Sequence, residues 1–362
     1  MPGPDCQSPN PITPIVMPDS FTYITINGKW VKTAALKVGN ETVVVTGRWI
    51  RMAEIHNEEW LAQEPVIRAG SFIPELKRLN AGADCFTFSQ TACNPNPGYK
   101  HYMEWDNAAA ISTKSFADWW EKDLPQVTRK NVRRSQKRGV VVREMKLDGD
   151  TISRIHRLYN QIQVKQGTQF AHFGKDLETV RRELSTFPER SEFLGAFHED
   201  ELIGFVKLIY MQNAAGIMHL VSRDEDYDKR PANALIAKAV QVCEAKGLTY
   251  LTYGKYTYGN KTRNPLTEFK RRMGFKKIEF PRYYIPLNLR GRIILRLRLH
   301  RGMLGLLPAG VINLLLRIRS ACLKRSETED AGSGSETDGA SSERVPAPSP
   351  VQQVNDAGVA QR

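Results

Sequence analysis

Residues 193–287 constrain the fold of this chain most, because their secondary-structure signals follow one another in a fixed order. Three apolar runs rich in β-branched and aromatic residues are interrupted by polar breaks at 198–200 and 212–216. This pattern predicts antiparallel strands joined by hairpins. Pro231 and Gly247 then bound a helical pattern, since proline favours the start of a helix and glycine its stop. Three further elements are predicted: an aromatic-rich strand over 248–260, a short helix over 265–275 and a closing strand over 276–287.

Positive charge stands at the start of the central helix. Lys229 and Arg230 directly precede Pro231, and a helix N-terminus with unpaired N–H groups attracts anions. The whole chain of 362 residues has a formal net charge of +13. Part of this charge is expected to be solvated surface. The remainder suggests an anionic partner: a phosphate-bearing cofactor, an acidic membrane surface or nucleic acid.

The chain divides into a leader, two α/β units and two tail segments. Residues 1–20 contain six prolines and are expected to be an extended or disordered leader. Residues 21–145 and 146–288 each combine strand and helix patterns, so the expected fold class is mixed α/β. The basic segment 289–325 and the Gly/Ser-rich acidic tail 326–362 follow, and the tail is expected to be disordered.

The segment 289–325 combines charge and apolarity in an unusual way. It contains nine Lys or Arg residues, one His and no acidic residue, and its first part alternates arginines with Ile and Leu. This pattern is typical of an element that lies on an anionic membrane surface. The alternative is a helix that packs on the protein's own surface.

Several classes of protein are not indicated. The five cysteines form no CxxC pair or regular framework, which favours a reducing compartment, and no His/Cys cluster has the spacing of metal ligands. No signal peptide is recognised, and no stretch approaches the roughly 20 apolar residues of a membrane span. We therefore expect a cytoplasmic protein without a bound metal, in peripheral contact with the inner face of the cell membrane.

Four sequence segments carry a family resemblance. In chain order they read RKNVRRSQKRGVVV, ELIGFVKL, RPANALIAKAV and LTEFKRRMGF. Residues 193–287 resemble the catalytic half of the GNAT N-acyltransferase superfamily, and 115–287 resemble its tandem-domain Fem-type branch, which transfers aminoacyl or acyl groups during cell-envelope assembly. The resemblance implies two GNAT-like units with a mixed, mainly antiparallel sheet. It also implies an acyl-CoA donor and a small-molecule amine acceptor that is nucleotide- or lipid-linked.

One segment departs from the family pattern. The acyl-CoA turn of GNAT proteins resembles (Q/R)xxGx(G/A), whereas residues 228–233 read DKRPAN and contain no glycine. Pro231 also lacks an N–H donor. Because Fem-type proteins resemble enzymes that use aminoacyl-tRNA, the identity of the donor stays open.

Amide formation needs a base for the amine, and the sequence offers candidates on the central strand. His219 is the candidate general base, with a hydrogen-bonded core histidine as the alternative. Asp224 is a candidate proton acceptor through water, with a solvated turn acid as the alternative. On the next strand Tyr256 resembles the general acid of many GNAT members, although alternating tyrosines also pack well on a strand.

The binding candidates fall into two groups. The donor is expected to contact residues of the central strand, the helix start and the last helix: Val221, Ser222, Lys229, Arg230, Asn233 and Lys270. The acceptor is expected to contact two residues of the loop 166–176, two arginines and two tyrosines: His172, Phe173, Arg133, Arg134, Tyr253 and Tyr258. For these positions the alternative is packing or a solvated surface.

The segment 129–138 has six basic residues in ten, which suits phosphates of tRNA, of a nucleotide-sugar or of a lipid pyrophosphate. No stacking aromatics interleave it, so DNA is not expected and tRNA is the less favoured partner. The predicted function is N-acyl transfer to an amine of a cell-envelope or polysaccharide precursor. The alternatives are an inactive GNAT-fold module that binds a nucleotide-sugar or lipid-linked intermediate, and a nonspecific RNA or tRNA binder.

Overall fold

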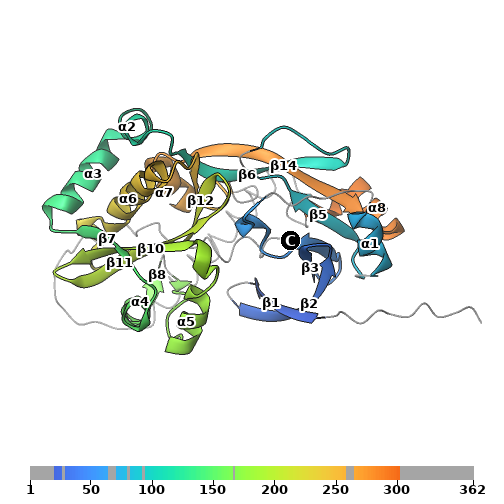
Figure 1. Cartoon of the computed structure of the whole chain (residues 1–362), viewed down its shortest axis with the longest axis horizontal. Coiled ribbons are helices and arrows are strands. Elements are labelled where there is room, and N and C mark those ends of the chain that lie inside the picture. Colours follow the sequence, from blue (N-terminus) through green and yellow to red (C-terminus); the bar gives the residue numbers. More distant parts are fainter. Residues whose placement is uncertain are drawn as a thin grey trace, which may run out of the picture.

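One mixed sheet organises the molecule. The computed structural model describes residues 20–26, 29–63, 71–79, 82–91, 94–165, 168–257 and 265–301. Twelve strands lie in the order β1-β2-β3-β4-β5-β14-β6-β13-β12-β11-β10-β7 (Figure 1). Most neighbours are antiparallel, and β4 with β5 and β12 with β13 are parallel. This confirms the expected fold class, a mixed α/β protein with a mainly antiparallel sheet.

The first half of the chain supplies six of these strands. They are β1 (Ser20–Ile26), β2 (Lys29–Val38), β3 (Glu41–Thr46), β4 (Met52–Ile55), β5 (Cys85–Ser89) and β6 (Tyr102–Ser112). The β2–β3 hairpin turns at Gly39, whose φ of +58° costs a glycine no strain. Helix α1 (Phe72–Arg78) connects the parallel strands β4 and β5.

The second half repeats this plan. Strands β7 (Val141–Met145), β10 (Ser191–His198), β11 (Glu201–Tyr210) and β12 (Ala214–Ser222) form successive antiparallel pairs. Helix α6 (Pro231–Ala245) then connects β12 to the parallel strand β13 (Tyr250–Thr252). Both halves therefore contain four antiparallel strands and a helical crossover to a parallel fifth strand.

The sixth strand of each half is exchanged. β6 belongs to the first half of the chain but pairs with β13, whereas β14 (Lys276–Pro286) comes from the second half and pairs with β5. β6 and β14 also pair with each other, from Lys276 opposite Ala110 to Tyr284 opposite Tyr102. The sheet is thus continuous across the division expected at residue 145.

Helices cover the second half on both sides of the sheet (Figure 1). Helices α6, α7 (Pro265–Arg272) and α3 (Gln126–Lys137) lie together on one side of β10–β12, and α4 (Gly149–Gln161) and α5 (Leu177–Leu184) lie on the other. Before α3, the chain forms α2 (Phe116–Asp118) and a π-helical turn (Trp119–Asp123), and extended backbone at Leu124 separates these from α3. The small strands β8 (Val164–Lys165) and β9 (Thr168–Gln169) pair with each other. Short 3₁₀ turns span Glu58–Trp60, Pro188–Arg190, Tyr227–Lys229 and Leu299–Arg301.

Each half buries a core that includes residues of the exchanged strand. The core of the first half gathers around Phe86 and includes Tyr283 and Ile285 of β14. The core on the α6 side of the second half includes Ala109 and Ile111 of β6. A third core lies between the sheet and helices α4 and α5. Neither of the first two cores is complete without the other half of the chain.

Part of the basic C-terminal segment packs on the protein. Helix α8 (Leu289–Arg296) buries Ile294 and Leu295 against Met52 and Cys85. For these two side chains the alternative, packing on the protein's own surface, holds. Residues 302–325 lie outside the described residues, as do the acidic tail and nearly all of the predicted leader.

Candidate functional site

Strands β12 and β13 pair over a short length only. Ala214, Ala215 and Gly216 lie opposite Tyr250–Thr252, and the rest of β12 extends beyond this ladder. Beyond Thr252 the chain continues along β6, on the other edge of β13: the amide of Tyr253 donates to the carbonyl of Ala109 at 2.9 Å. Residues 217–222 of β12, which include three predicted site residues, are not covered by β13.

A β-bulge at Met218 sets the direction of the His219 side chain. Lys207 of β11 lies opposite His219, but the next residue, Leu208, lies opposite Ile217, so Met218 is the extra residue. Ile217 consequently packs in the core on the α6 side, whereas Val221 packs in the core beneath α4 and α5. A simple alternation along β12, which would place Ile217, His219 and Val221 on one face, is wrong.

His219 lies in a buried polar cluster beneath α4 and α5. It is 8% exposed, and its ring centroid lies 5.7 Å from that of His172 and 6.3 Å from that of Phe205. Burial lowers the pKa of His219 well below its usual value, and the electrostatic effects of the neighbouring His172 and Lys207 side chains lower the pKa further. The imidazole is therefore neutral at pH 7 and has a nitrogen that can accept a hydrogen bond.

Charged neighbours hold His172 in place. Its Nδ1 lies 3.1 Å from the Nζ of Lys175 and 3.5 Å from a carboxylate oxygen of Glu183, and its ring stacks on Tyr159 at 4.4 Å. Burial of Glu183 raises its pKa, but His172 and Lys175 outweigh this effect and lower the pKa to about 2. The structure thus brings together His219 and His172, which the sequence assigned to separate roles. Phe173 packs at the edge of the same core.

The sequence pattern did not reveal the buried lysine beside this histidine pair. Lys207 is fully buried, and its Nζ donates to the carbonyls of Leu184 and Thr186 and to the hydroxyl of Thr186, at 2.7–2.8 Å. Burial lowers its pKa to about 7. A lysine within the apolar run of β11 was the available signal, because lysine is rarely buried.

Of the predicted tyrosines, Tyr253 and Tyr256 do not lie on a strand. β13 ends at Thr252, so Tyr253 and Tyr256 follow it, and Tyr258 lies outside the described residues. Tyr253 is buried, with the ammonium of Lys270 over its ring at 4.8 Å. Lys270 is itself buried rather than solvated: it donates to the carbonyl of Lys255 at 2.7 Å, and burial lowers its pKa to about 7. Tyr256 is half-buried at the edge of the α6-side core.

The glycine-free turn before α6 does not fit a backbone site for a pyrophosphate. Pro231 has no N–H, and the amide of Asn233 already donates to the carbonyl of Arg230 at 3.1 Å. Arg230 takes the left-handed conformation with φ +56° and lies over the ring of Tyr227 at 4.1 Å. Lys229 is paired with Asp226 at 2.8 Å. The two predicted cations are therefore engaged within the turn.

The carboxylates near the end of β12 differ in exposure. Asp224 is exposed in the turn that follows the strand, whereas Asp226 is buried and bonds to Arg223 and Lys229. Val221 and Ser222 are buried at the end of β12. Asp226 thus serves as an ion-pair partner within the fold, whereas Asp224 is accessible to solvent.

A basic stripe on and just after α3 faces outward. Thr128, Val132 and Ser135 form the buried side of the helix, and Thr128 donates to the carbonyl of Arg272 on α7. The opposite side carries five basic residues of the segment 129–138, all of them exposed: Lys130, Arg133, Arg134, Lys137 and Arg138. Arg138 pairs with Asp228 and so ties the stripe to the turn before α6.

Neither a metal cluster nor a membrane-spanning helix occurs among the described residues. No group of three or more His, Cys, Asp or Glu side chains in this part of the chain is arranged to hold a metal ion. Likewise, none of the helices that the structure describes combines the length and apolarity needed to cross a bilayer.

Similarity to known proteins identifies the domain that carries this site. Residues 126–271 match the model described as "Acetyltransferase (GNAT) domain". The crystal structure of FemX has a TM-score of 0.51 at 10% identity, over 76% of this chain and 90% of its own. The predicted resemblance to the GNAT superfamily and to the fold of its Fem-type branch is thereby confirmed. No curated protein sequence matches the chain.

Two further solved structures are similar to a lesser degree. The C-terminal domain (DUF2156) of a putative lysylphosphatidylglycerol synthetase from Agrobacterium fabrum has a TM-score of 0.47 at 12% identity, over 74% of this chain and 88% of its own. L-PGS from Bacillus licheniformis has a TM-score of 0.46 at 12% identity, over 71% of this chain and 87% of its own.

Proposed function

We propose that this chain, whose residues 126–271 form a GNAT domain, is an N-acyltransferase that moves an acyl or aminoacyl group to an amine of a cell-envelope or polysaccharide precursor. The observation that carries the proposal is the position of His219 on the part of β12 that β13 does not cover, with the ring of His172 beside it. An acceptor with a nucleotide or lipid phosphate matches the positive charge of the chain. Such an acceptor is consistent with a cytoplasmic enzyme at the inner face of the membrane.

In this proposal His219 accepts a hydrogen bond from the acceptor amine. A neutral imidazole can take up the proton that the amine loses as it attacks the acyl carbon. His172, fixed by Glu183 and Lys175, lies beside His219 and orients the acceptor. Tyr256 is the proposed acid for the leaving group, because it follows β13 just beyond the point where the β12–β13 ladder ends.

The test is a transfer assay with the purified protein, a panel of acyl-CoA donors and amino-sugar acceptors, read as thiol release. We expect His219→Ala and His172→Ala each to lower kcat by about 100-fold, a usual contribution of a general base. His198→Ala, at the hairpin end of β10, is the matched control and should leave the rate unchanged. Full activity of both His172→Ala and His219→Ala would rule out this pair as the catalytic machinery.

The turn before α6 favours a second candidate. Because residues 228–233 offer a poor backbone site for a pyrophosphate, the candidate is a module that binds a nucleotide-sugar or lipid-linked intermediate without acyl transfer. Calorimetric titration of amino-sugar nucleotides, run beside the thiol-release assay, distinguishes the two. Tight acceptor binding without thiol release from any acyl-CoA, and without transfer from aminoacyl-tRNA, favours the binding module.

A further inference from the structure

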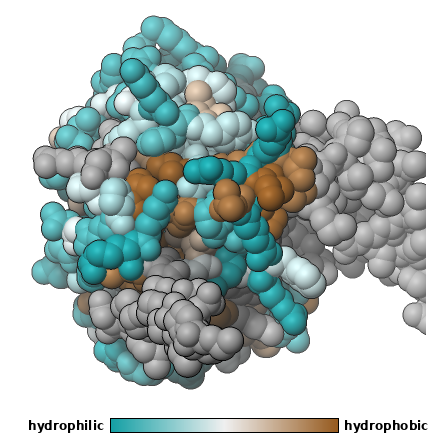
Figure 2. Space-filling model, turned by 90° about the vertical axis from the view of Figure 1, so that its right-hand side faces the viewer, coloured by the Kyte–Doolittle hydropathy of each residue, from teal (hydrophilic) through white to brown (hydrophobic). Residues whose placement is uncertain are grey.

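Helix α8 presents an apolar side to solvent. Leu289, Ile293 and Leu297 recur every four residues, so they lie along one side of the helix and its C-terminal cap. Their exposed fractions are 73%, 56% and 56%. Figure 2, which views the end of the molecule that carries α8, shows a hydrophobic band bordered by hydrophilic side chains. The opposite side of α8 packs on Met52 and Cys85, so the exposed residues face away from that core.

An exposed tryptophan adjoins this helix. Trp49 is 80% exposed, and its carbonyl accepts a hydrogen bond from the guanidinium of Arg290 on α8. Tryptophan is enriched where proteins meet the headgroup region of a bilayer, because its ring is apolar and its N–H is polar. Leu289, Ile293 and Leu297 with Trp49 are called the α8 face below.

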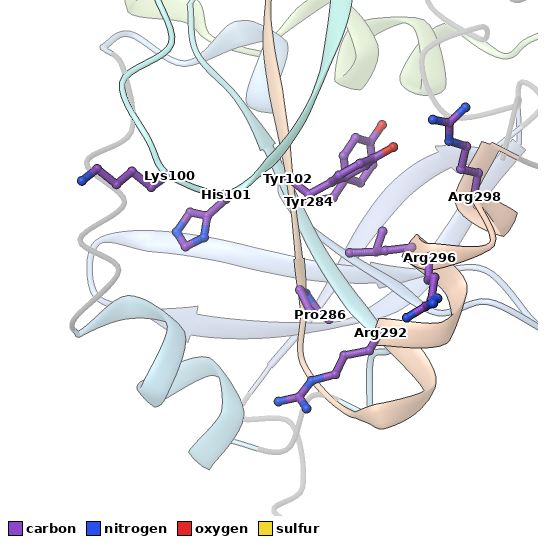
Figure 3. A pocket seen from close by; sticks show the side chains of 9 residues that line it. Lys100, His101, Tyr102, Tyr284, Pro286, Arg292, Arg296 and Arg298 are labelled. Atoms are coloured by element: carbon purple, nitrogen blue, oxygen red, sulfur yellow. The ribbon is translucent and has the colours of Figure 1, made fainter.

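A cationic cavity opens beside the α8 face. Its volume is about 480 Å³, and it lies between α8, the start of β6 and the end of β14 (Figure 3). Tyr102 and Tyr284 lie side by side within it, and three arginines border it from α8 and the turn that follows: Arg292, Arg296 and Arg298. Lys100 and His101 line its other side. Four side chains with a permanent positive charge thus line one cavity.

The acidic residue near this cavity does not neutralise the three arginines. Glu104 accepts hydrogen bonds from Tyr102, His300 and Arg301 at 2.8–3.0 Å. Among the described residues, no hydrogen bond or ion pair engages the guanidinium of Arg292, Arg296 or Arg298. These three cations are therefore available to an external anion, and planar guanidinium groups suit a phosphate.

We propose that the α8 face docks on an anionic lipid bilayer and that the cationic cavity takes the phosphate of a lipid headgroup. Apolar side chains that insert shallowly and arginines that meet anionic headgroups are the two requirements of interfacial binding, and α8 supplies both. A second copy of the chain is disfavoured as the occupant, because two arginine-rich faces repel. Residues 302–325 are disfavoured for the same reason, since they add basic residues and no acidic one.

The test is co-sedimentation of the full chain with vesicles of phosphatidylcholine alone or with one quarter phosphatidylglycerol. Two variants probe the two features: Ile293→Ser/Leu297→Ser for the apolar side and Arg292→Gln/Arg296→Gln for the cavity. The matched control is Arg157→Gln/Arg181→Gln, which removes the same charge from exposed positions on α4 and α5, away from α8 (Figure 1). Brominated lipids, which quench nearby tryptophans, report on Trp49 by comparison with Trp49→Phe.

We expect binding to the anionic vesicles only, weakened about tenfold or more by either α8 variant and unchanged in the control. Brominated anionic vesicles should quench the wild type more than Trp49→Phe. The proposal is overturned if both α8 variants sediment like the wild type, because binding then lies elsewhere in the chain. It is also overturned if sedimentation velocity shows a dimer that Ile293→Ser/Leu297→Ser dissociates, since the face would then bind a second copy. Because none of these readouts uses acyl transfer, their failure is distinct from a failure of the proposed activity.

Discussion

Lys207 on β11 lies directly opposite His219 on β12, so a buried ammonium and a buried imidazole face the same side of the sheet. The three acceptors around the Nζ of Lys207 match its three N–H donors. When the Lys207 amine is protonated, its charge disfavours protonation of His219 and so favours the neutral imidazole.

The buried lysine predicts a pH-dependent stability. The folded state lowers the pKa of Lys207 from 10.5 to about 7, so between these values the unfolded chain binds more protons and stability rises with pH. Lys207→Met lacks this contribution. Its free energy of unfolding should therefore rise less than that of the wild type between pH 7 and 10, by up to about 4 kcal/mol. Guanidinium unfolding at pH 7, 8, 9 and 10 measures the difference from the wild type. Lys77→Met, at an exposed position on α1, should keep the wild-type slope; an equal rise in Lys207→Met would contradict the burial of the charge.

The ion pairs of Glu183 predict a loss of stability in acid. Its pKa in the folded state lies at about 2, below the ordinary 4.5, so its ion pairs stabilise the fold above pH 4.5 and are lost as the pH falls towards 2. Glu183→Gln should therefore lose less stability than the wild type between pH 5 and 3. At pH 7 it should be about 2 kcal/mol less stable than the wild type. Thermal melts over this range provide the measurement. Glu178→Gln, an exposed residue of α5, is the control, and identical acid profiles for the two variants would refute the role of Glu183.

The packing of α8 makes Gly291 sensitive to substitution. A Cβ at this position would overlap the carbonyl of Asp84 and lie 3.2 Å from the Sγ of Cys85. Gly291→Ala should destabilise the protein by about 2–3 kcal/mol, because backbone has to move to admit the methyl group. Gly149→Ala at the start of α4, where no atom lies within 4 Å of the added methyl, should be neutral or slightly stabilising. The denaturant midpoints of the two variants measure this difference in stability. Equal midpoints would mean that α8 does not pack as described.

The basic stripe on α3 predicts a salt-dependent affinity for phosphates. Replacing Lys130, Arg133 and Arg134 by Gln should reduce the slope of log K against log salt for tRNA by about 2–3, since each lost phosphate contact removes roughly one released counterion. Filter binding between 50 and 200 mM salt is the measurement. The control removes three exposed charges elsewhere: Lys77→Gln/Arg157→Gln/Arg181→Gln. An unchanged slope in the α3 variant would mean that the stripe is solvated surface.

Local signals in the sequence were sufficient for most elements but not for the arrangement of the site. Pro231 and Gly247 predicted α6, because proline and glycine act on their own backbone. The bulge at Met218 depends on how β11 pairs with β12, which no local pattern encodes, so the sequence alone does not show that Ile217 and His219 face opposite sides of the sheet. The roles of Lys207 and Glu183 in the site depend on contacts with residues that are distant from them in the sequence. The strand expected over 248–260 is shorter in the structure, where β13 ends at Thr252.

The exchange of β6 and β14 also governs when the protein can fold. During synthesis β5 and β6 leave the ribosome long before β14, yet β14 lies between them and supplies Tyr283 and Ile285 to the core of the first half. A nascent chain that has not reached Lys276 therefore holds two strands with open edges and an incomplete core, a state prone to aggregation. The two halves mature together, so a product truncated before β14 should be handled by the cell as unfolded protein rather than as a smaller working enzyme.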